Sequence, residues 1–131
     1  MDALKAPLKS SNDIVLARQL VRRGAQEAGL NLVDQTKIVT AASELARNAL
    51  IHGLGGEMTM QVVENGTRRG VRLTFIDQGP GIPNIELALT DGWTSGTGLG
   101  MGLSGARRLV NDFEIQSRVG EGTRVTIARW K

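Results

Sequence analysis

The chain of 131 residues contains no cysteine and no tyrosine, and aromatic residues make up only 3% of it. The lack of cysteine excludes disulfides and thiolate-bound zinc, and nothing else in the composition indicates secretion. Scarce aromatic side chains leave almost nothing on which the bases of a single-stranded nucleic acid could stack. These two deficits weigh against a disulfide-bonded scaffold, a zinc module and a single-strand-binding protein.

Long hydrophobic runs are also missing. No stretch approaches the roughly 18 apolar residues that a membrane span requires, and the first residues, MDALKAPLKSS, lack the apolar segment of a signal peptide. We therefore expect a soluble, cytoplasmic protein without a membrane partner. The length predicts a single domain over residues 1–131, large enough to bury its own core.

The charge balance is mildly basic, with 16 Lys and Arg against 13 Asp and Glu, a net charge of +3 and a pI of about 10.0. Pairs of arginines stand at 22–23, 68–69 and 107–108. Solvated surface is the expected role of these pairs, and a basic groove for DNA or an acidic partner protein is the alternative. We expect no nucleic-acid partner.

The first third of the chain reads as a strand and two helices. Residues 3–9 alternate loosely, as an edge strand does, and Ser10 to Asn12 offer N-caps for a helix that Gly29 ends. A second helix begins near Asp34, and Gly53 lies where a C′ glycine belongs. Its apolar stripe consists of Ile38, Ala42, Leu45 and Ala49.

The pattern then changes to period two, which predicts strands at 58–62 and 71–75 joined by the turn ENGTRR. A stretch rich in glycine and threonine follows, from residue 77 to residue 105. The remaining elements are a helix from Gly102 to about Asn111 and strands at 113–117 and 123–130. This order predicts an α/β two-layer sandwich, with a mixed, mostly antiparallel sheet and helices on one face.

Three polar side chains stand at intervals of four on the second helix. Glu44, Asn48 and His52 share one stripe beside the apolar stripe, at the expected border between core and cleft. They are either ordinary solvated helix residues or members of a site. An asparagine amide oxygen is a ligand suited to Mg²⁺, and a carboxylate one turn away can take a proton from an attacking hydroxyl.

The segment IDQGPGIP places Asp77 at the end of an apolar strand and follows it with Gly79 and Gly81. Such residues form tight turns without any function. They also suit a second role, because an acid fixed at a strand end can accept a hydrogen bond from an exocyclic amine while bare backbone lets a flat ring approach. Adenine carries such an amine.

A third segment, GWTSGTGLGMGLSG, ends in a formal G-x-G-x-x-G pattern at 100–105. The dinucleotide fingerprint must follow a strand directly, and this segment does not, so we reject that interpretation. The Walker pattern is excluded too, because no Gly-Lys-Ser/Thr follows. Two interpretations of the segment are left, a flexible linker and a phosphate-binding loop. In a phosphate-binding loop, glycines expose backbone N–H groups to an anion just before the start of a helix.

The sequence GEGT at 120–123 needs no function as a hairpin turn. If the sheet closes over a pocket, Thr123 would support Asp77 at its base.

These four segments, in this order over residues 44 to 123, resemble the motifs of the GHKL (Bergerat-fold) ATPases. The motifs are E-x-x-x-N, D-x-G-x-G, a G-x-G-x-G lid and a G-T pair. The resemblance implies that the chain binds ATP with Mg²⁺ coordinated by Asn48, and that Asp77 binds the adenine amine. The further ATP-binding residues that it implies are Gly79, Gly81, Gly98, Leu99, Gly100, Met101, Gly102 and Thr123.

Within this superfamily, the small size, the run SELARN and the short glycine lid look like the serine/threonine kinases that act as switches of the stressosome. The resemblance implies phosphorylation of a STAS-domain antagonist, with Glu44 as the base facing the substrate hydroxyl. It implies as partners the stressosome scaffold and a PP2C-type phosphatase upstream of a sigma factor. Related anti-sigma factors offer an alternative, in which the chain sequesters a sigma factor and its kinase activity is weak.

Overall fold

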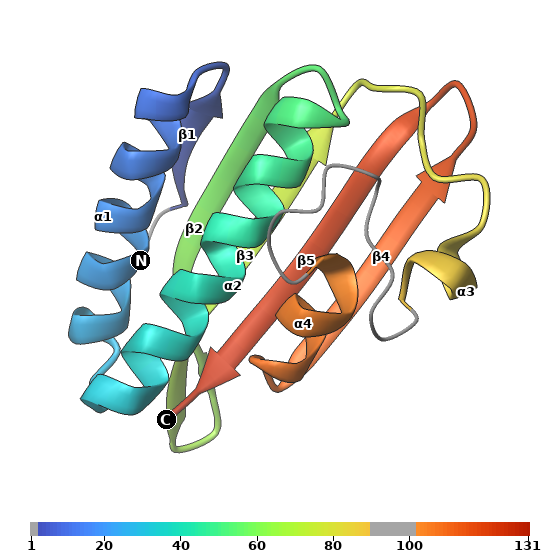
Figure 1. The fold of residues 1–131 in the computed structure, drawn as a ribbon. Helices are drawn as coiled ribbons and strands as arrows, with labels where there is room; N and C mark the ends of the chain where they lie inside the picture. Colours follow the sequence, from blue (N-terminus) through green and yellow to red (C-terminus); the bar gives the residue numbers. More distant parts are fainter. Residues whose placement is uncertain (1–2, 90–101) are drawn as a thin grey trace.

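A computed structural model describes residues 3–89 and 102–131 and shows one β-sheet with helices on one of its faces (Figure 1). The helices are α1 (Ser11–Glu27), α2 (Leu32–Ile51), α3 (Ile85–Ala88) and α4 (Gly102–Arg108). The strands are β1 (Leu4–Leu8), β2 (Gly56–Asn65), β3 (Arg68–Asp77), β4 (Asp112–Arg118) and β5 (Gly122–Trp130). No helix in these described ranges is both long and apolar enough to cross a membrane.

The strands lie in the order β1-β2-β3-β5-β4, and each neighbouring pair is antiparallel. The predicted two-layer sandwich is therefore confirmed, with β1 at the edge as expected. The expectation of a mixed sheet is wrong for the described strands. Short hairpins join β2 to β3 and β4 to β5, and a hairpin imposes antiparallel pairing.

Local capping explains where the two long helices begin. Ser10 is the N-cap of α1, and its Oγ accepts the backbone N–H of Asp13 at 3.3 Å. Helix α2 begins at Leu32, two residues before the predicted start, because Asn31 already caps it and accepts the N–H of Asp34 at 2.8 Å. The end of α1 follows the prediction, since Gly29 adopts the left-handed conformation with φ +83°.

The last third of the chain differs from the prediction in two helices. Helix α3 was missed because its four residues are too short to carry a periodic pattern. Helix α4 ends at Arg108 instead of about Asn111. The N–H of Asn111 bonds to the carbonyl of Ala128 in β5 at 2.9 Å, so this residue is already paired with the sheet.

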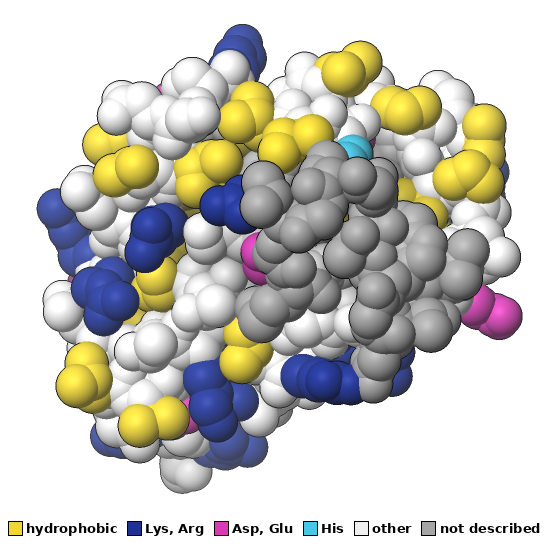
Figure 2. Space-filling view, in the orientation of Figure 1, with side chains coloured by type: hydrophobic (Ala, Val, Ile, Leu, Met, Phe, Trp, Pro, Cys, Tyr) yellow, Lys and Arg dark blue, Asp and Glu magenta, His cyan; other side chains and the backbone are white. Residues whose placement is uncertain are grey.

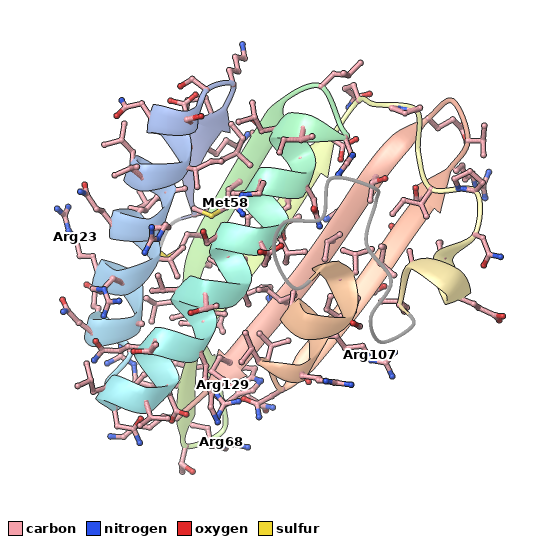
Figure 3. The ribbon with its side chains drawn as sticks, viewed as in Figure 1. Arg23, Met58, Arg68, Arg107 and Arg129 are labelled. Atoms are coloured by element: carbon pink, nitrogen blue, oxygen red, sulfur yellow. The ribbon has the colours of Figure 1, made fainter. Side chains whose placement is uncertain are left out.

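The core lies between the helices and the sheet. It includes the whole apolar stripe of α2 that the sequence predicted. Met58 on β2 is fully buried there, whereas Arg23, Arg68 and Arg107 extend outward from the exposed surface (Figure 3). One member of each arginine pair is thus solvated surface, as expected.

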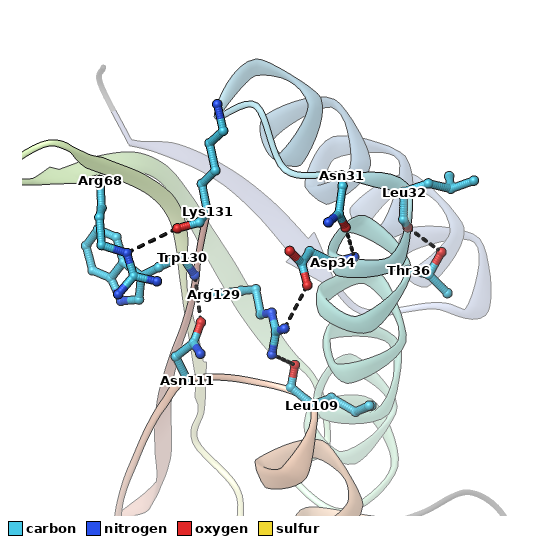
Figure 4. A network of polar contacts seen from close by, with 10 residues as sticks. All are labelled: Asn31, Leu32, Asp34, Thr36, Arg68, Leu109, Asn111, Arg129, Trp130 and Lys131. Carbon is cyan, nitrogen blue, oxygen red and sulfur yellow. Dashed lines mark hydrogen bonds and ion pairs between the residues drawn. The ribbon is translucent and has the colours of Figure 1, made fainter.

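A polar cluster closes the end of the molecule where β5 finishes (Figure 4). Arg129 donates to the Oδ1 of Asp34 at 2.7 Å and to the carbonyl of Leu109 at 3.4 Å. Both charged side chains are mostly buried, at 17% and 19% exposure. The ion pair therefore ties the first turn of α2 to β5 and to the residue after α4.

Candidate functional site

A cavity of about 280 Å³ opens at the C-terminal end of α2, between this helix, β3, β5 and the start of α4. Its apolar wall is formed by Leu45, Ala49, Phe75, Leu103 and Val125. Its polar groups are Asn48, His52, Asp77 and Thr123. An apolar cavity with a few convergent polar groups is the usual form of a small-molecule site.

Of the three polar residues in the α2 stripe, two line the cavity and one does not. Asn48 and His52 line the cavity and are half-buried. Glu44 lies one turn earlier and is not among the lining residues; its side chain is buried, and the guanidinium of Arg47 lies 4.0 Å from its Oε1. The amide is thus at the cavity, and the carboxylate is set back along the same face of the helix.

Asp77 ends β3 at the cavity and is held by its own turn. The backbone N–H of Gly79 donates to its Oδ1 at 2.9 Å. Burial raises the pKa of the Asp77 carboxyl above its ordinary 3.8, while hydrogen bonds from the backbone of Gly79 and Thr123 act in the opposite direction. The result is a fixed acceptor in a partly desolvated place.

Close packing around Asp77 explains why glycine occupies positions 53 and 79. A Cβ built on Gly53 would overlap the Asp77 side chain and lie 2.5 Å from its Oδ2, and a Cβ on Gly79 would lie 2.5 Å from the Cα of Gly53. Gly53 does not serve as the left-handed C′ residue that the sequence suggested, because the positive φ angles fall on Leu54 and Gly55. Its role is to let the helix end touch the aspartate.

The turn that carries Gly81 is anchored to the β4–β5 hairpin. Gly81 has φ +81°, and a side chain there would overlap the carbonyl of Arg118. The N–H of Ile82 donates to the Oγ of Ser117 at 2.8 Å. That oxygen also lies 2.8 Å from the Oγ1 of Thr123, which lines the cavity.

Ser117 is a residue that the sequence reasoning missed. It looks like an ordinary strand residue, yet it connects the Gly81 turn with the cavity. Thr123 also pairs with Asp77 across β3 and β5, in the register that the predicted support of the aspartate requires.

The glycine-rich segment enters the site at Gly102, which lines the cavity with φ +69°. Gly98, Leu99, Gly100 and Met101 lie outside the described residues. The structure thus brings together five predicted positions, namely Asn48, Asp77, Gly81, Gly102 and Thr123. Gly79 does not line the cavity, and its backbone N–H donates to Asp77.

Comparisons with known proteins find a matching family and similar sequences. Residues 33–131 match the family described as histidine kinase-, DNA gyrase B- and HSP90-like ATPases. The chain is 43% identical over 118 residues to the serine/threonine-protein kinase RsbT of Bacillus subtilis, covering 90% of this chain and 89% of that protein. It is 32% identical to an anti-sigma F factor of Clostridium acetobutylicum, covering 96% and 90% of the two chains.

Two solved structures share the fold. The RsbU and RsbW domains of Rv1364c from Mycobacterium tuberculosis superpose with a TM-score of 0.68 at 25% identity, over 98% of this chain and 32% of that longer chain. The catalytic domain of the histidine kinase ThkA superposes with a TM-score of 0.53 at 18% identity, over 98% and 95% of the chains. The family match, from residue 33 to residue 131, spans every residue that lines the cavity.

Proposed function

The chain belongs to the family of histidine kinase-, DNA gyrase B- and HSP90-like ATPases, and we propose that it transfers the γ-phosphate of ATP to a serine or threonine of a STAS-domain antagonist. Two predictions from the sequence are confirmed, namely the resemblance to GHKL ATPases and the enzyme class, a protein serine/threonine kinase. The substrate, the role of each site residue and the cellular setting belong to the proposal.

The placement of Asp77 is the observation that carries the proposal. Its carboxylate is oriented by the N–H of Gly79 in a cavity whose walls are apolar. A flat adenine ring suits such walls, and its exocyclic amine would donate to the carboxylate. Guanine has a carbonyl oxygen at the equivalent position, so the same carboxylate would reject it.

Asn48 is suited to a bound Mg²⁺, because its amide is half-buried at the cavity beside the start of α4. Mg²⁺ prefers oxygen ligands and usually shares a protein ligand or two with phosphate oxygens and waters. The ion would neutralise charge on the phosphates during transfer. Asn48 would supply the protein ligand of this ion.

The glycine-rich segment would bind the phosphates through backbone N–H groups. We assign this role to Gly98, Leu99, Gly100, Met101 and Gly102, of which Gly102 lines the cavity. Side chains at the glycines would crowd the phosphates, which is the physical reason for so bare a backbone.

Glu44 is the proposed base. The substrate hydroxyl oxygen attacks the γ-phosphorus, the bond from that phosphorus to the bridging oxygen breaks, and ADP leaves. The hydroxyl proton passes to the Glu44 carboxylate. Its side chain is buried with the Arg47 guanidinium 4.0 Å away, one turn from Asn48 on the same face of α2, and a carboxylate so placed could accept the proton of an incoming hydroxyl.

The relatives support the choice of partners. The 43% identity is to a serine/threonine-protein kinase, which supports phosphoryl transfer to a protein, and the 32% identity is to an anti-sigma F factor, which supports a role in sigma-factor regulation. We propose a cytoplasmic switch whose partners are a STAS-domain antagonist, the stressosome scaffold and a PP2C-type phosphatase. The second candidate function, sequestration of a sigma factor, is favoured by the anti-sigma relatives.

Transfer of label from γ-labelled ATP to a STAS-domain protein of the same organism tests the proposal. The wild type should label the partner, and Asn48→Ala should abolish labelling while leaving the fold nearly intact. Asn12→Ala, an exposed asparagine on α1, is the matched control and should label normally. Labelling by Asn48→Ala at the wild-type rate would contradict the metal assignment. Co-purification with a sigma factor, without transfer to the STAS protein, would favour the second candidate.

A further inference from the structure

Leu54, just after the end of α2, combines two unfavourable features. Among the described residues it is the one non-glycine with positive φ, at 59°, and its side chain is 83% exposed. A Cβ is disfavoured in that backbone region, and a large apolar side chain gains nothing from solvent. Glycines stand at 53, 55 and 56 around it, so the fold itself has no need of a leucine here.

Leu54 directly follows two residues that line the cavity, although it does not line the cavity itself. The two residues before it, His52 and Gly53, line the cavity, and Ile51 at the last position of α2 is 44% exposed. We name Ile51 and Leu54 the apolar rim. A Cβ built on Gly55 would lie 3.4 Å from the carbonyl oxygen of Leu8 and 4.0 Å from Lys9 Cγ, so the segment after α2 lies near the end of β1, just before α1 begins. Hydrophobic side chains gather at this end of the helix layer (Figure 2).

The helix layer that the rim adjoins is basic along its length, and Arg47 is the cation of α2 that lies about one turn from Ile51. Helices α1 and α2 carry five cationic side chains, at Arg18, Arg22, Arg23, Lys37 and Arg47. Three of their four acids are already engaged: Asp34 pairs with Arg129, Glu44 is buried, and Asp13 accepts the N–H of Lys9. Figure 2 shows the resulting dark blue side chains over the helix layer. An acidic surface is therefore complementary to this face.

We propose that the apolar rim is the docking contact for the protein substrate, and that this substrate presents apolar side chains flanked by acidic ones around its acceptor hydroxyl. The proposal rests on the proposed function, because the acceptor hydroxyl must reach phosphates held in the cavity next to which the rim lies. Glu44, Arg47 and Ile51 follow one another at intervals of three and four, so base, cation and rim share one side of α2.

Charge distinguishes the acidic protein substrate from two other possible partners, a second copy of the chain and a nucleic acid. A second copy of the chain would bring an equally basic helix face against this one, and like charges would repel. A nucleic acid would use the cations but would gain nothing from two exposed aliphatic side chains. An acidic protein with an apolar contact uses both features.

The test compares Leu54→Gly and Ile51→Asn with Leu32→Asn. Leu32 is a matched control, since it is an exposed leucine at the other end of α2, about 28 Å from Ile51 along the helix. With the STAS-domain protein as substrate, each rim variant should raise the KM for that protein at least tenfold. The Kd for ATP and the kcat at saturating substrate should stay within about twofold of wild type, and Leu32→Asn should change nothing.

Leu54→Gly gives the sharpest result, because it relieves backbone strain and should melt at the same temperature as wild type or higher. A merely structural leucine would give a lower melting temperature with an unchanged KM. If the double variant of Ile51 and Leu54 shows a wild-type KM, the docking site is wrong while the kinase proposal stands. If the wild type neither binds nor labels the STAS protein, both proposals are overturned.

Discussion

Replacing Gly53 with alanine tests whether the end of α2 holds Asp77 in place. The added Cβ would lie 2.5 Å from Asp77 Oδ2, where an ordinary contact is at least 3.4 Å, so the carboxylate must move by about 1 Å. The backbone of Gly53 is outside the left-handed region, so alanine brings steric overlap and no dihedral strain. Overpacking of this kind costs about 1–3 kcal/mol, which lowers the melting temperature by roughly 4–12 °C.

The same displacement removes the oriented acceptor for the adenine amine. A hydrogen bond to a charged group contributes about 1.5–3 kcal/mol, so the Kd for ATP should rise roughly 10- to 100-fold. Calorimetric titration with ATP and Mg²⁺ measures this change, and thermal denaturation measures the loss of stability.

Gly24→Ala is the matched control. Its Cβ would lie 2.6 Å from the Sδ of Met60, an equally close overlap, but a methionine side chain can shift. Alanine also gains about 1 kcal/mol of helix propensity there. This variant should melt near the wild-type temperature and bind ATP with wild-type affinity. Wild-type affinity and stability in Gly53→Ala would refute the role assigned to the contact with Asp77.

Three further variants follow from the structure. Burial raises the pKa of Asp77, so the folded state binds the proton of this carboxyl more tightly than the unfolded state does. The stability that this group contributes therefore falls as the pH rises from about 3.8 through the raised pKa, and it stays lower above that pKa. Asp77→Asn removes the free-energy cost of burying the charged carboxylate, so this variant should melt at or above the wild-type temperature at pH 7. It should also bind ATP at least about tenfold more weakly. A lower melting temperature would contradict the direction of the pKa shift. Asp34→Asn leaves the mostly buried Arg129 without its partner and should lower the free energy of unfolding in urea by roughly 1–3 kcal/mol, with an unchanged Kd for ATP. Ser117→Ala removes the acceptor of the Ile82 N–H and should cost about 1–2 kcal/mol in urea while weakening ATP binding, and an unchanged Kd would show that the Gly81 turn does not depend on this anchor.

The sequence was sufficient for features that repeat along one element. The stripe at Ile38, Ala42, Leu45 and Ala49 repeats at helical spacing, and each of these residues is buried as predicted. The alternation along β2 and β3 likewise predicted which side chains face the helices, and the buried Met58 and Phe75 follow it. Periodicity reports burial directly, because each element must turn one face to the core.

Features that depend on contacts between distant segments could not be predicted. Gly53 has the position of a C-cap glycine, and only the structure shows that it makes room for Asp77, 24 residues later. Ser117 has no local pattern at all, although its hydroxyl joins the Gly81 turn to Thr123. Hairpin geometry explains the antiparallel pairing of β2 with β3 and of β4 with β5, whereas the pairings of β1 with β2 and of β3 with β5 join distant segments that no local pattern predicted.

The most direct test of the account is a pair of calorimetric titrations of the wild type, one with ATP and one with GTP, both with Mg²⁺. Recognition of the adenine amine by Asp77 predicts binding of ATP with an affinity at least about tenfold above that for GTP. Equal affinities for ATP and GTP, or no heat with either nucleotide, would contradict the central claim that this cavity specifically binds an adenine base.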